Sequence, residues 1–177
     1  PASGVAITAA LLHAFNHTLF KGSLFLGAAS VEAASKTRDM NRLGGLIKTM
    51  PRTSVLLLGG ALSVAALMPF NGFVSEWMTY QAAFLAIANG QEGLNTLFLL
   101  SVAGLAMTGA LAVAAYVKLF GITCLGKSRS QEAADAREVS LPMTLGTGLL
   151  TAMCLLTGLF PMAIVRIIRV VTEGLSK

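Results

Sequence analysis

The chain has 177 residues, of which 55% are hydrophobic and 12% charged, and its mean hydropathy is +0.74. Soluble domains carry about 25% charged residues, so this composition excludes an ordinary soluble domain and indicates a membrane protein. The net charge is +5. Because the basic residues are not interleaved with aromatic ones, a nucleic-acid-binding surface is also excluded.

Four apolar runs are each long enough to cross a hydrocarbon layer of about 30 Å, which takes about 20 helical residues. They cover residues 5–31, 53–89, 97–120 and 142–165. The sequence therefore predicts a single all-α membrane domain over residues 1–177, with four transmembrane passes.

The run 53–89 is too long for one straight crossing and contains Pro69, Asn71 and Gly72. Proline removes a helical hydrogen bond and clashes with the preceding turn, so the helix is predicted to break near residues 69–72. Two arrangements fit this break: a hairpin of two short spans, or one discontinuous helix that crosses once.

The basic residues of the loops favour the discontinuous helix. Loops 34–52 and 121–141 carry Lys and Arg, whereas loop 90–96 has neither. The positive-inside rule places both basic loops in the cytoplasm, which a single broken crossing allows. The arginines after Pro161 then fall outside, unless residues 162–169 lie along the membrane surface as an amphipathic helix.

Three charged residues fall within the predicted spans: Lys21, Glu76 and Lys118. Lys118 is close to the predicted end of its span, where a long side chain can extend to the interface. Lys21 and Glu76 are deeper, where an ionisable group costs about 2.5 to 3.5 kcal/mol. Such residues ordinarily face protein or water, so both are candidate functional residues.

His13, His17 and Lys21 recur at four-residue intervals, so they project from one helical face over about 12 Å. Imidazole and amine groups can exchange protons near neutral pH, which is the chemistry of a proton relay. Asn16 beside them can hold an ordered water. Two alternatives stay open: structural hydrogen bonds between helices, or a metal bound by both histidines, for which no third ligand is close in sequence.

Glu76 follows the predicted break, where it can meet water and the positive end of the second half-helix. Ser75 or Asn71 is expected to cap that helix end. The alternative is that the carboxylate of Glu76 only stabilises the helix start. Cys124 and Cys154 are far apart in sequence and are interpreted as packing thiols.

Motifs for nucleotide, haem or iron–sulfur binding do not occur, so we expect no cofactor, metal or catalytic centre in this chain. Because the first residue is Pro1, we expect the sequence to be part of a longer chain.

Three segments together carry a family resemblance: residues 13–27 (HAFNHTLFKGSLFLG), 37–45 (TRDMNRLGG) and 69–77 (PFNGFVSEW). They resemble the antiporter-like proton-pumping membrane subunits of respiratory complex I, multisubunit cation/proton antiporters and membrane-bound hydrogenases. The ending of the third segment and residues 120–126 are most similar to the large membrane subunit of formate hydrogenlyase and hydrogenase-4 type complexes.

The resemblance implies two inverted repeats, each with a broken helix, of which this chain is the C-terminal part. It places His13, His17 and Lys21 on the family's relay column, and Glu76 on its discontinuous-helix charged position. Secondary candidates are Lys118, Asn16 and Ser75.

The resemblance also implies the setting of the protein. The expected partners are other membrane subunits, a peripheral redox arm, the lipid bilayer and protons or sodium ions. The expected location is the bacterial or archaeal inner membrane. The chain is then a non-redox, ion-translocating subunit of an oxidoreductase complex; a cation/proton antiporter subunit and a purely structural subunit remain alternatives.

Overall fold

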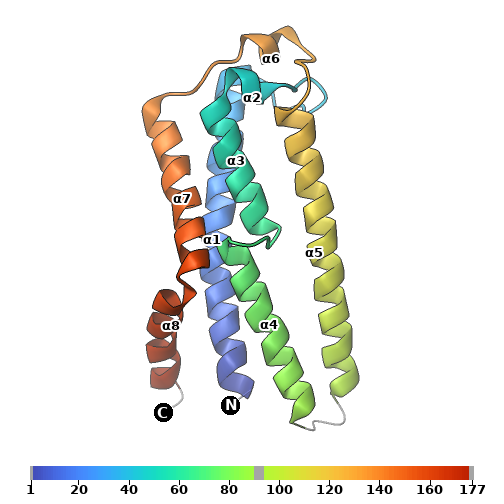
Figure 1. Ribbon diagram of the computed structural model, residues 1–177, viewed down its shortest axis with the longest axis vertical. Coiled ribbons are helices and arrows are strands. Elements are labelled where there is room, and N and C mark those ends of the chain that lie inside the picture. The colour runs from blue at the N-terminus through green and yellow to red at the C-terminus, as the bar shows by residue number, and fades with distance from the viewer. Residues whose placement is uncertain (1, 90–93, 176–177) are drawn as a thin grey trace.

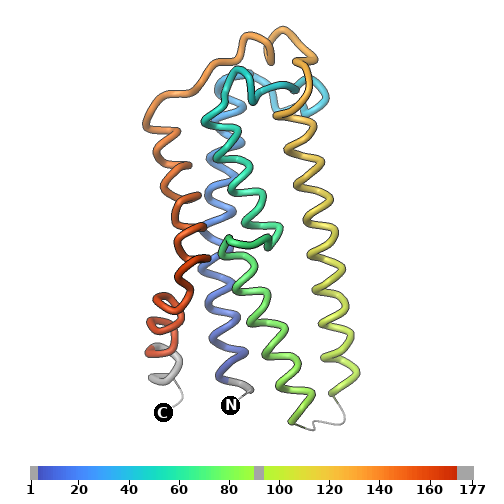
Figure 2. Tube along the Cα trace, in the orientation of Figure 1, coloured from blue at the N-terminus to red at the C-terminus, as the bar shows by residue number. Residues whose placement is uncertain are grey.

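The computed structural model describes residues 2–89 and 94–175, and over those ranges it is helical with no β-strand. The all-α prediction is thus confirmed there. The helices run along the long axis of an elongated bundle (Figures 1 and 2). The long elements are α1 (Ala2–Ser35), α3 (Pro51–Val64), α4 (Asn71–Ala88), α5 (Asn95–Cys124), α7 (Leu141–Leu159) and α8 (Pro161–Leu175); α2 (Leu46–Thr49) and α6 (Gln131–Asp135) are short helices in the loops.

α1 is the central helix of the bundle, because it packs against α3, α4, α7 and α8. α5 packs on α3 and α4 at one side of the bundle, and its most apolar stretch is not buried by the rest of the chain. Among the described helices, α5 and α7 are each long and apolar enough to cross a membrane on their own.

The segment between α3 and α4, residues 65–70, interrupts the helical run and is called the interruption below. α4 continues beyond α3 along the same axis of the bundle (Figure 1). The break lies slightly earlier than the predicted residues 69–72. α3 already ends in a turn in which Ala66 takes a φ of 52° and the Leu67 amide donates to the Leu62 carbonyl at 3.1 Å.

The remaining helix ends also differ from the prediction. The run 142–165 is divided, because α7 ends at Leu159 and α8 begins at Pro161, a residue that suits the first turn of a helix. α8 is the amphipathic helix expected after this proline. α5 extends to Cys124 rather than residue 120, so Lys118 lies more than a turn before its end.

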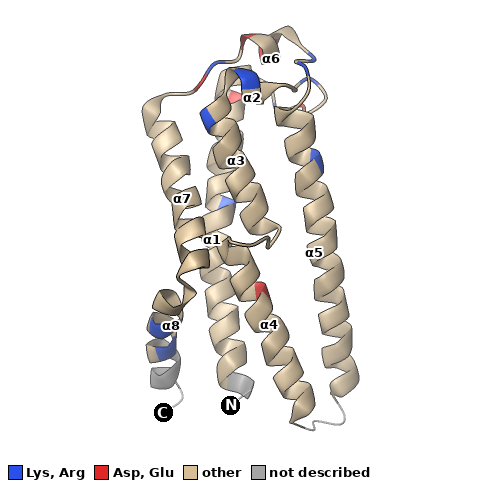
Figure 3. Cartoon of the chain, in the orientation of Figure 1, with Lys and Arg blue, Asp and Glu red and all other residues tan. Residues whose placement is uncertain are grey.

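The two basic loops meet at one end of the bundle, where α2 and α6 lie and charged residues gather (Figure 3). The Gly45 amide donates to the Leu125 carbonyl at 2.9 Å, and Arg42 pairs with Glu132. Gly44, with a φ of 147°, lies so close to the Lys127 carbonyl that a side chain would overlap it.

The same end also fixes the start of α3. The Glu138 carboxylate accepts hydrogen bonds from the backbone amides of Arg52 and Thr53, at 3.0 and 3.1 Å. The first amides of a helix lack partners within the helix, so this carboxylate satisfies two of them. The connection before α7 is thereby joined to α3.

Candidate functional site

Paired amides join α1 to the first residue of α4, directly after the interruption. The Asn16 side-chain amide donates to the Asn71 carbonyl at 2.9 Å, and the Asn71 side-chain amide donates to Asn16 Oδ1 at 3.0 Å. The Ser63 hydroxyl donates to Asn71 Oδ1 at 2.5 Å, and all three side chains are buried. These neutral side chains satisfy one another's polar atoms, so α1, α3 and α4 are joined here without a charged group.

His13 contacts the first turns of α4. Its Nδ1 lies 3.1 Å from the hydroxyl of Ser75, and that hydroxyl donates to the Gly72 carbonyl at 3.1 Å. The ring centroids of His13 and His17 are 6.1 Å apart, so the two imidazoles are consecutive along α1. His17 is exposed at the surface of the described chain, whereas His13 is half-buried.

The N-terminus of α4 is not capped by the side chains that the sequence predicted. Its N-cap residue is Phe70, which has no side-chain cap, so the predicted capping by Ser75 or Asn71 is wrong. Asn71 instead contacts α1 and α3, and Ser75 faces His13. Glu76 lies in the second turn of α4, beyond the first turn in which a helix dipole acts most strongly.

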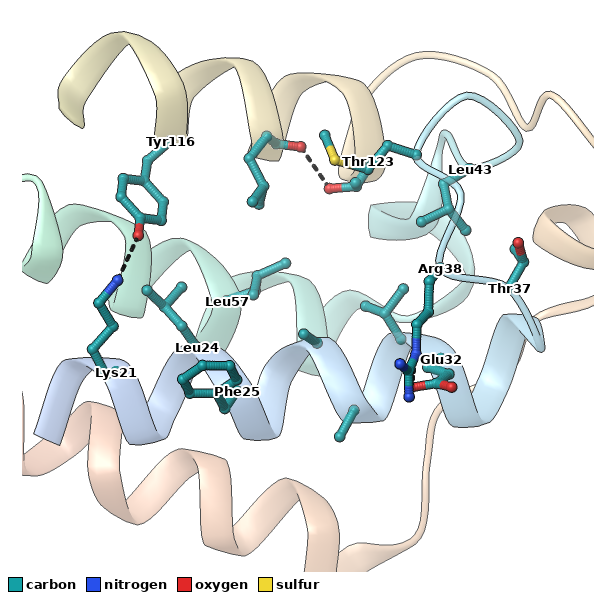
Figure 4. A pocket seen from close by; sticks show the side chains of 15 residues that line it. Lys21, Leu24, Phe25, Glu32, Thr37, Arg38, Leu43, Leu57, Tyr116 and Thr123 are labelled. Atoms are coloured by element: carbon teal, nitrogen blue, oxygen red, sulfur yellow. Dashed lines mark hydrogen bonds and ion pairs between the residues drawn. The ribbon is translucent and has the colours of Figure 1, made fainter. Parts of the chain in front are cut away.

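Lys21 lies at one end of a cavity of about 590 Å³ between α1, α3 and α5. Its ammonium donates to the Tyr116 hydroxyl of α5 at 3.4 Å (Figure 4). The opposite end of the cavity holds an ion pair of Arg38 and Glu32, at 2.8 Å, and the hydrogen bond that Arg38 donates to the Glu32 carboxylate raises the pKa of Arg38. Leucine, alanine and phenylalanine side chains line most of the space between these ends.

Glu76 is half-buried and faces α5. Its carboxylate lies opposite Gly109, where a Cβ atom would sit 3.8 Å from Oε2. Among the described residues, none forms an ion pair or hydrogen bond with this carboxylate. The group is therefore placed to take up or release a proton without first breaking a salt bridge.

The structure brings some of the predicted residues together and leaves others apart. Hydrogen bonds join Asn16 to Asn71 and His13 to Ser75, in the first turns of α4. Lys118 is exposed and does not line the cavity. Within the described ranges no third His, Cys, Asp or Glu joins the histidines to form a metal-binding group. Both cysteines are buried and neither forms a disulfide, in agreement with packing thiols.

Two α5 residues at the site were missed by sequence reasoning: Gly109 and Tyr116. They are seven residues apart, which places both on one face of a helix. A tyrosine within an apolar run was the available signal, because a buried tyrosine hydroxyl normally has a hydrogen-bond partner.

Solved structures share the fold of this chain. The chain superposes on a structure of the Mrp complex from Dietzia sp. DQ12-45-1b with a TM-score of 0.82, at 20% identity, covering 97% of this chain and 38% of that one. It also matches the archaeal membrane-bound sulfane sulfur reductase, with a TM-score of 0.71 and 27% identity over 87% of this chain and 24% of that one. The chain thus shares its fold with part of a chain in each of these two complexes.

Sequence relatives give a consistent result. Over 88% of its length the chain is 42% identical to hydrogenase-4 component B of Escherichia coli K12, and over 87% it is 41% identical to formate hydrogenlyase subunit 3 of the same strain. It is 33% identical to Na(+)/H(+) antiporter subunit A1 of Staphylococcus aureus over 88% of its length. The chain spans 20 to 25% of the length of these relatives.

The model of the transmembrane family of NADH:quinone oxidoreductases and Mrp antiporters matches residues 2–108. The chain belongs to this family. The resemblance noted in the sequence is confirmed.

Proposed function

We propose that the chain is part of a proton-translocating subunit of a redox-driven membrane complex, in which His13, His17, Lys21 and Glu76 relay protons. One observation carries the proposal: the polar face of α1 is hydrogen-bonded to the first turns of α4, directly after the interruption, and Lys21 lies on that face of α1 while Glu76 lies in those turns. Charges at membrane depth are costly and are ordinarily kept for ion pathways. Backbone that is not helical is tolerated there when it lines a cavity or is covered by protein.

In this proposal the chain crosses the membrane four times, and α3 and α4 together make the second crossing. Two observations support this topology. α4 continues along the axis of α3 instead of turning back (Figure 1), and the two basic loops are hydrogen-bonded to each other at one end. That end is then cytoplasmic under the positive-inside rule.

The relay follows the α1 face. His13 and His17 are consecutive, and Lys21 follows one turn later, facing the cavity. His13 also reaches Ser75, the neighbour of Glu76 in α4. Protons pass between the α1 column and Glu76, and the open carboxylate of Glu76 exchanges them with the aqueous side.

The driving force comes from outside the chain. A separate peripheral arm carries out the redox chemistry, and other membrane subunits of a bacterial or archaeal inner membrane complex complete the ion path. The relatives named for hydrogenase-4 and formate hydrogenlyase favour a hydrogenase arm. No cofactor is assigned to this chain.

The test uses the full-length subunit in its complex, in closed membrane vesicles. Proton uptake and electron-transfer turnover are measured in parallel for Lys21→Ala and Glu76→Gln. We expect each variant to lose proton uptake while turnover and assembly are retained. Lys48→Ala, an exposed lysine in α2, is the matched control. Normal uptake in assembled Lys21→Ala and Glu76→Gln complexes would rule out the relay and favour a structural role.

Cation/proton antiport is a second candidate, favoured by the relative named as a Na(+)/H(+) antiporter subunit. Lysine and glutamate serve proton and sodium transport alike. The same vesicles distinguish the two functions: antiport predicts sodium-dependent dissipation of an imposed pH gradient without any electron donor. Redox-driven pumping predicts uptake only when the donor is present.

A further inference from the structure

α5 contacts both deep ionisable groups, although they belong to different helices. Glu76 of α4 faces Gly109, and Lys21 of α1 donates to the Tyr116 hydroxyl. Gly109 and Tyr116 are seven residues apart, so they share one face of α5 and are separated by about 10 Å along its axis. The half-buried side chains on this face between them, Ala112 and Val113, are small.

The bond between Lys21 and Tyr116 crosses a gap. The cavity separates α1 from α5, and within the described residues this is the one hydrogen bond between side chains of the two helices. In Figure 4 the Tyr116 ring extends from α5 toward Lys21, with its hydroxyl directed at the ammonium. A phenylalanine would fill nearly the same volume but lacks the hydroxyl. The Tyr116→Phe substitution therefore removes this one hydrogen bond and leaves the shape of the side chain almost unchanged.

We propose that Tyr116 is a positioning residue for Lys21, and that its hydroxyl holds the ammonium against the α5 face that also meets Glu76. This inference rests on the proposed proton relay and adds α5 to it. In one transfer the Lys21 ammonium loses a proton and becomes an amine, and the Glu76 carboxylate gains a proton and becomes an acid. Tyr116 ends the step with its own proton in place.

Few other charged or titratable groups surround Lys21. His17 precedes it by one turn on α1, and Tyr116 faces it from α5. Glu32 and Arg38 are at the far end of the cavity, about 16 Å away along α1. α7 contains no charged residue, and Arg52 of α3 lies at the loop end of that helix. Loss of the tyrosine hydroxyl therefore removes the hydrogen-bond partner that Lys21 has outside α1.

The first experiment is Tyr116→Phe in the full complex, with proton uptake measured against pH and against electron-transfer turnover. We expect uptake per turnover to fall about three- to ten-fold, the range for a lost hydrogen bond to a charged group in a membrane. We also expect the pH profile of uptake to change, because the hydroxyl no longer contacts the ammonium that carries the proton. Thr108→Val, which removes an exposed hydroxyl from the same helix, is the control.

The second variant tests the Glu76 end of the α5 face. Gly109→Leu fills the space opposite the carboxylate, whereas Gly104→Leu makes the same change where no atom lies within 4 Å. We expect Gly109→Leu to lower uptake per turnover and Gly104→Leu to leave it unchanged. This pair keeps the inference testable if Tyr116→Phe fails to assemble.

The outcomes separate the inference from the proposed function. If Lys21→Ala abolishes uptake but assembled Tyr116→Phe and Gly109→Leu complexes keep the wild-type uptake and pH profile, the role of α5 is overturned and the relay stands. If Lys21→Ala itself pumps normally, the proposed function fails first. A purely structural Tyr116 would reduce the amount of complex and leave the pH profile of the remainder in place.

Discussion

The middle of the bundle and its loop end are held together by different chemistry. On both sides of the interruption, hydrogen bonds between the neutral, buried side chains of Asn16, Ser63 and Asn71 join α1, α3 and α4. At the loop end, the exposed charges of Arg42 and Glu132 pair with each other. Neutral hydrogen bonds suit lipid because no charge has to be desolvated.

This difference bears on why Lys21 and Glu76 are present in the middle of the bundle. Neutral amides are sufficient to join helices at the interruption, so packing does not require a lysine or a glutamate there. Each of the two instead faces space beside α5, at the cavity or opposite a glycine. The middle of the bundle therefore combines a neutral hydrogen-bonded scaffold with two ionisable groups that take no part in it.

The largest loss of stability is expected at Gly158, where the backbone of α7 lies directly against the backbone of the interruption. A Cβ atom at Gly158 of α7 would overlap the backbone of Pro69 and Phe70 in the interruption. Gly158→Ala is therefore expected to destabilise the subunit by about 3 kcal/mol or more, the upper range for overpacking. The measurement is the midpoint of thermal unfolding of the purified complex in detergent.

Gly148→Ala is the matched control on the same helix. Its added Cβ would meet Leu56 at 3.7 Å, which is an ordinary contact. We expect the control to unfold at the wild-type temperature. Equal unfolding midpoints for the two variants would show that α7 does not lock the interruption in place.

A smaller effect is expected from the amide pair. Asn71→Ala removes the partner of Asn16 Oδ1 and of the Ser63 hydroxyl while both remain buried. Leaving buried polar groups unsatisfied costs about 1 to 3 kcal/mol, which the same unfolding measurement detects. Asn89→Ala, which removes an exposed amide bonded only within α4, is the control. A loss no greater than that of the control would contradict the scaffold role.

Sequence reasoning predicted the regular features well because they depend on local composition. Apolar run length gave the helices, and Pro69 gave the break to within a few residues. The four-residue spacing of His13, His17 and Lys21 placed them on one helix. The sequence could not assign their partners, because Asn71, Ser75 and Tyr116 are brought to them by packing between distant segments.

The predicted helix caps were wrong for a physical reason. Ser75 and Asn71 are residue types that often cap helices, but tertiary partners on α1 and α3 compete for their side chains. Lys118, a secondary candidate, is exposed, because the rotation of α5 directs Tyr116 into the cavity instead. Helix rotation depends on the packing partner, which a single sequence does not specify.

The smallest effect belongs to the charged loop end. Hydrogen bonds to its own backbone amide and to Ser130, together with the nearby Arg42, lower the pKa of Glu132 below that of an ordinary carboxyl group. A lowered pKa means that the unfolded loop binds the proton more tightly, so the stabilisation is complete above the ordinary carboxyl pKa and disappears as the pH falls through the lowered one.

Because Glu132 is exposed, water and salt screen most of this contribution. We therefore expect Glu132→Gln to reduce amide-exchange protection of residues 125–136 slightly at neutral pH and not at all in acid, where the wild type is protonated too. Hydrogen exchange at several pH values and at two salt concentrations measures this, with Asp135→Asn as the control. A loss of protection that persisted in acid would mean that packing and not charge holds the loops together.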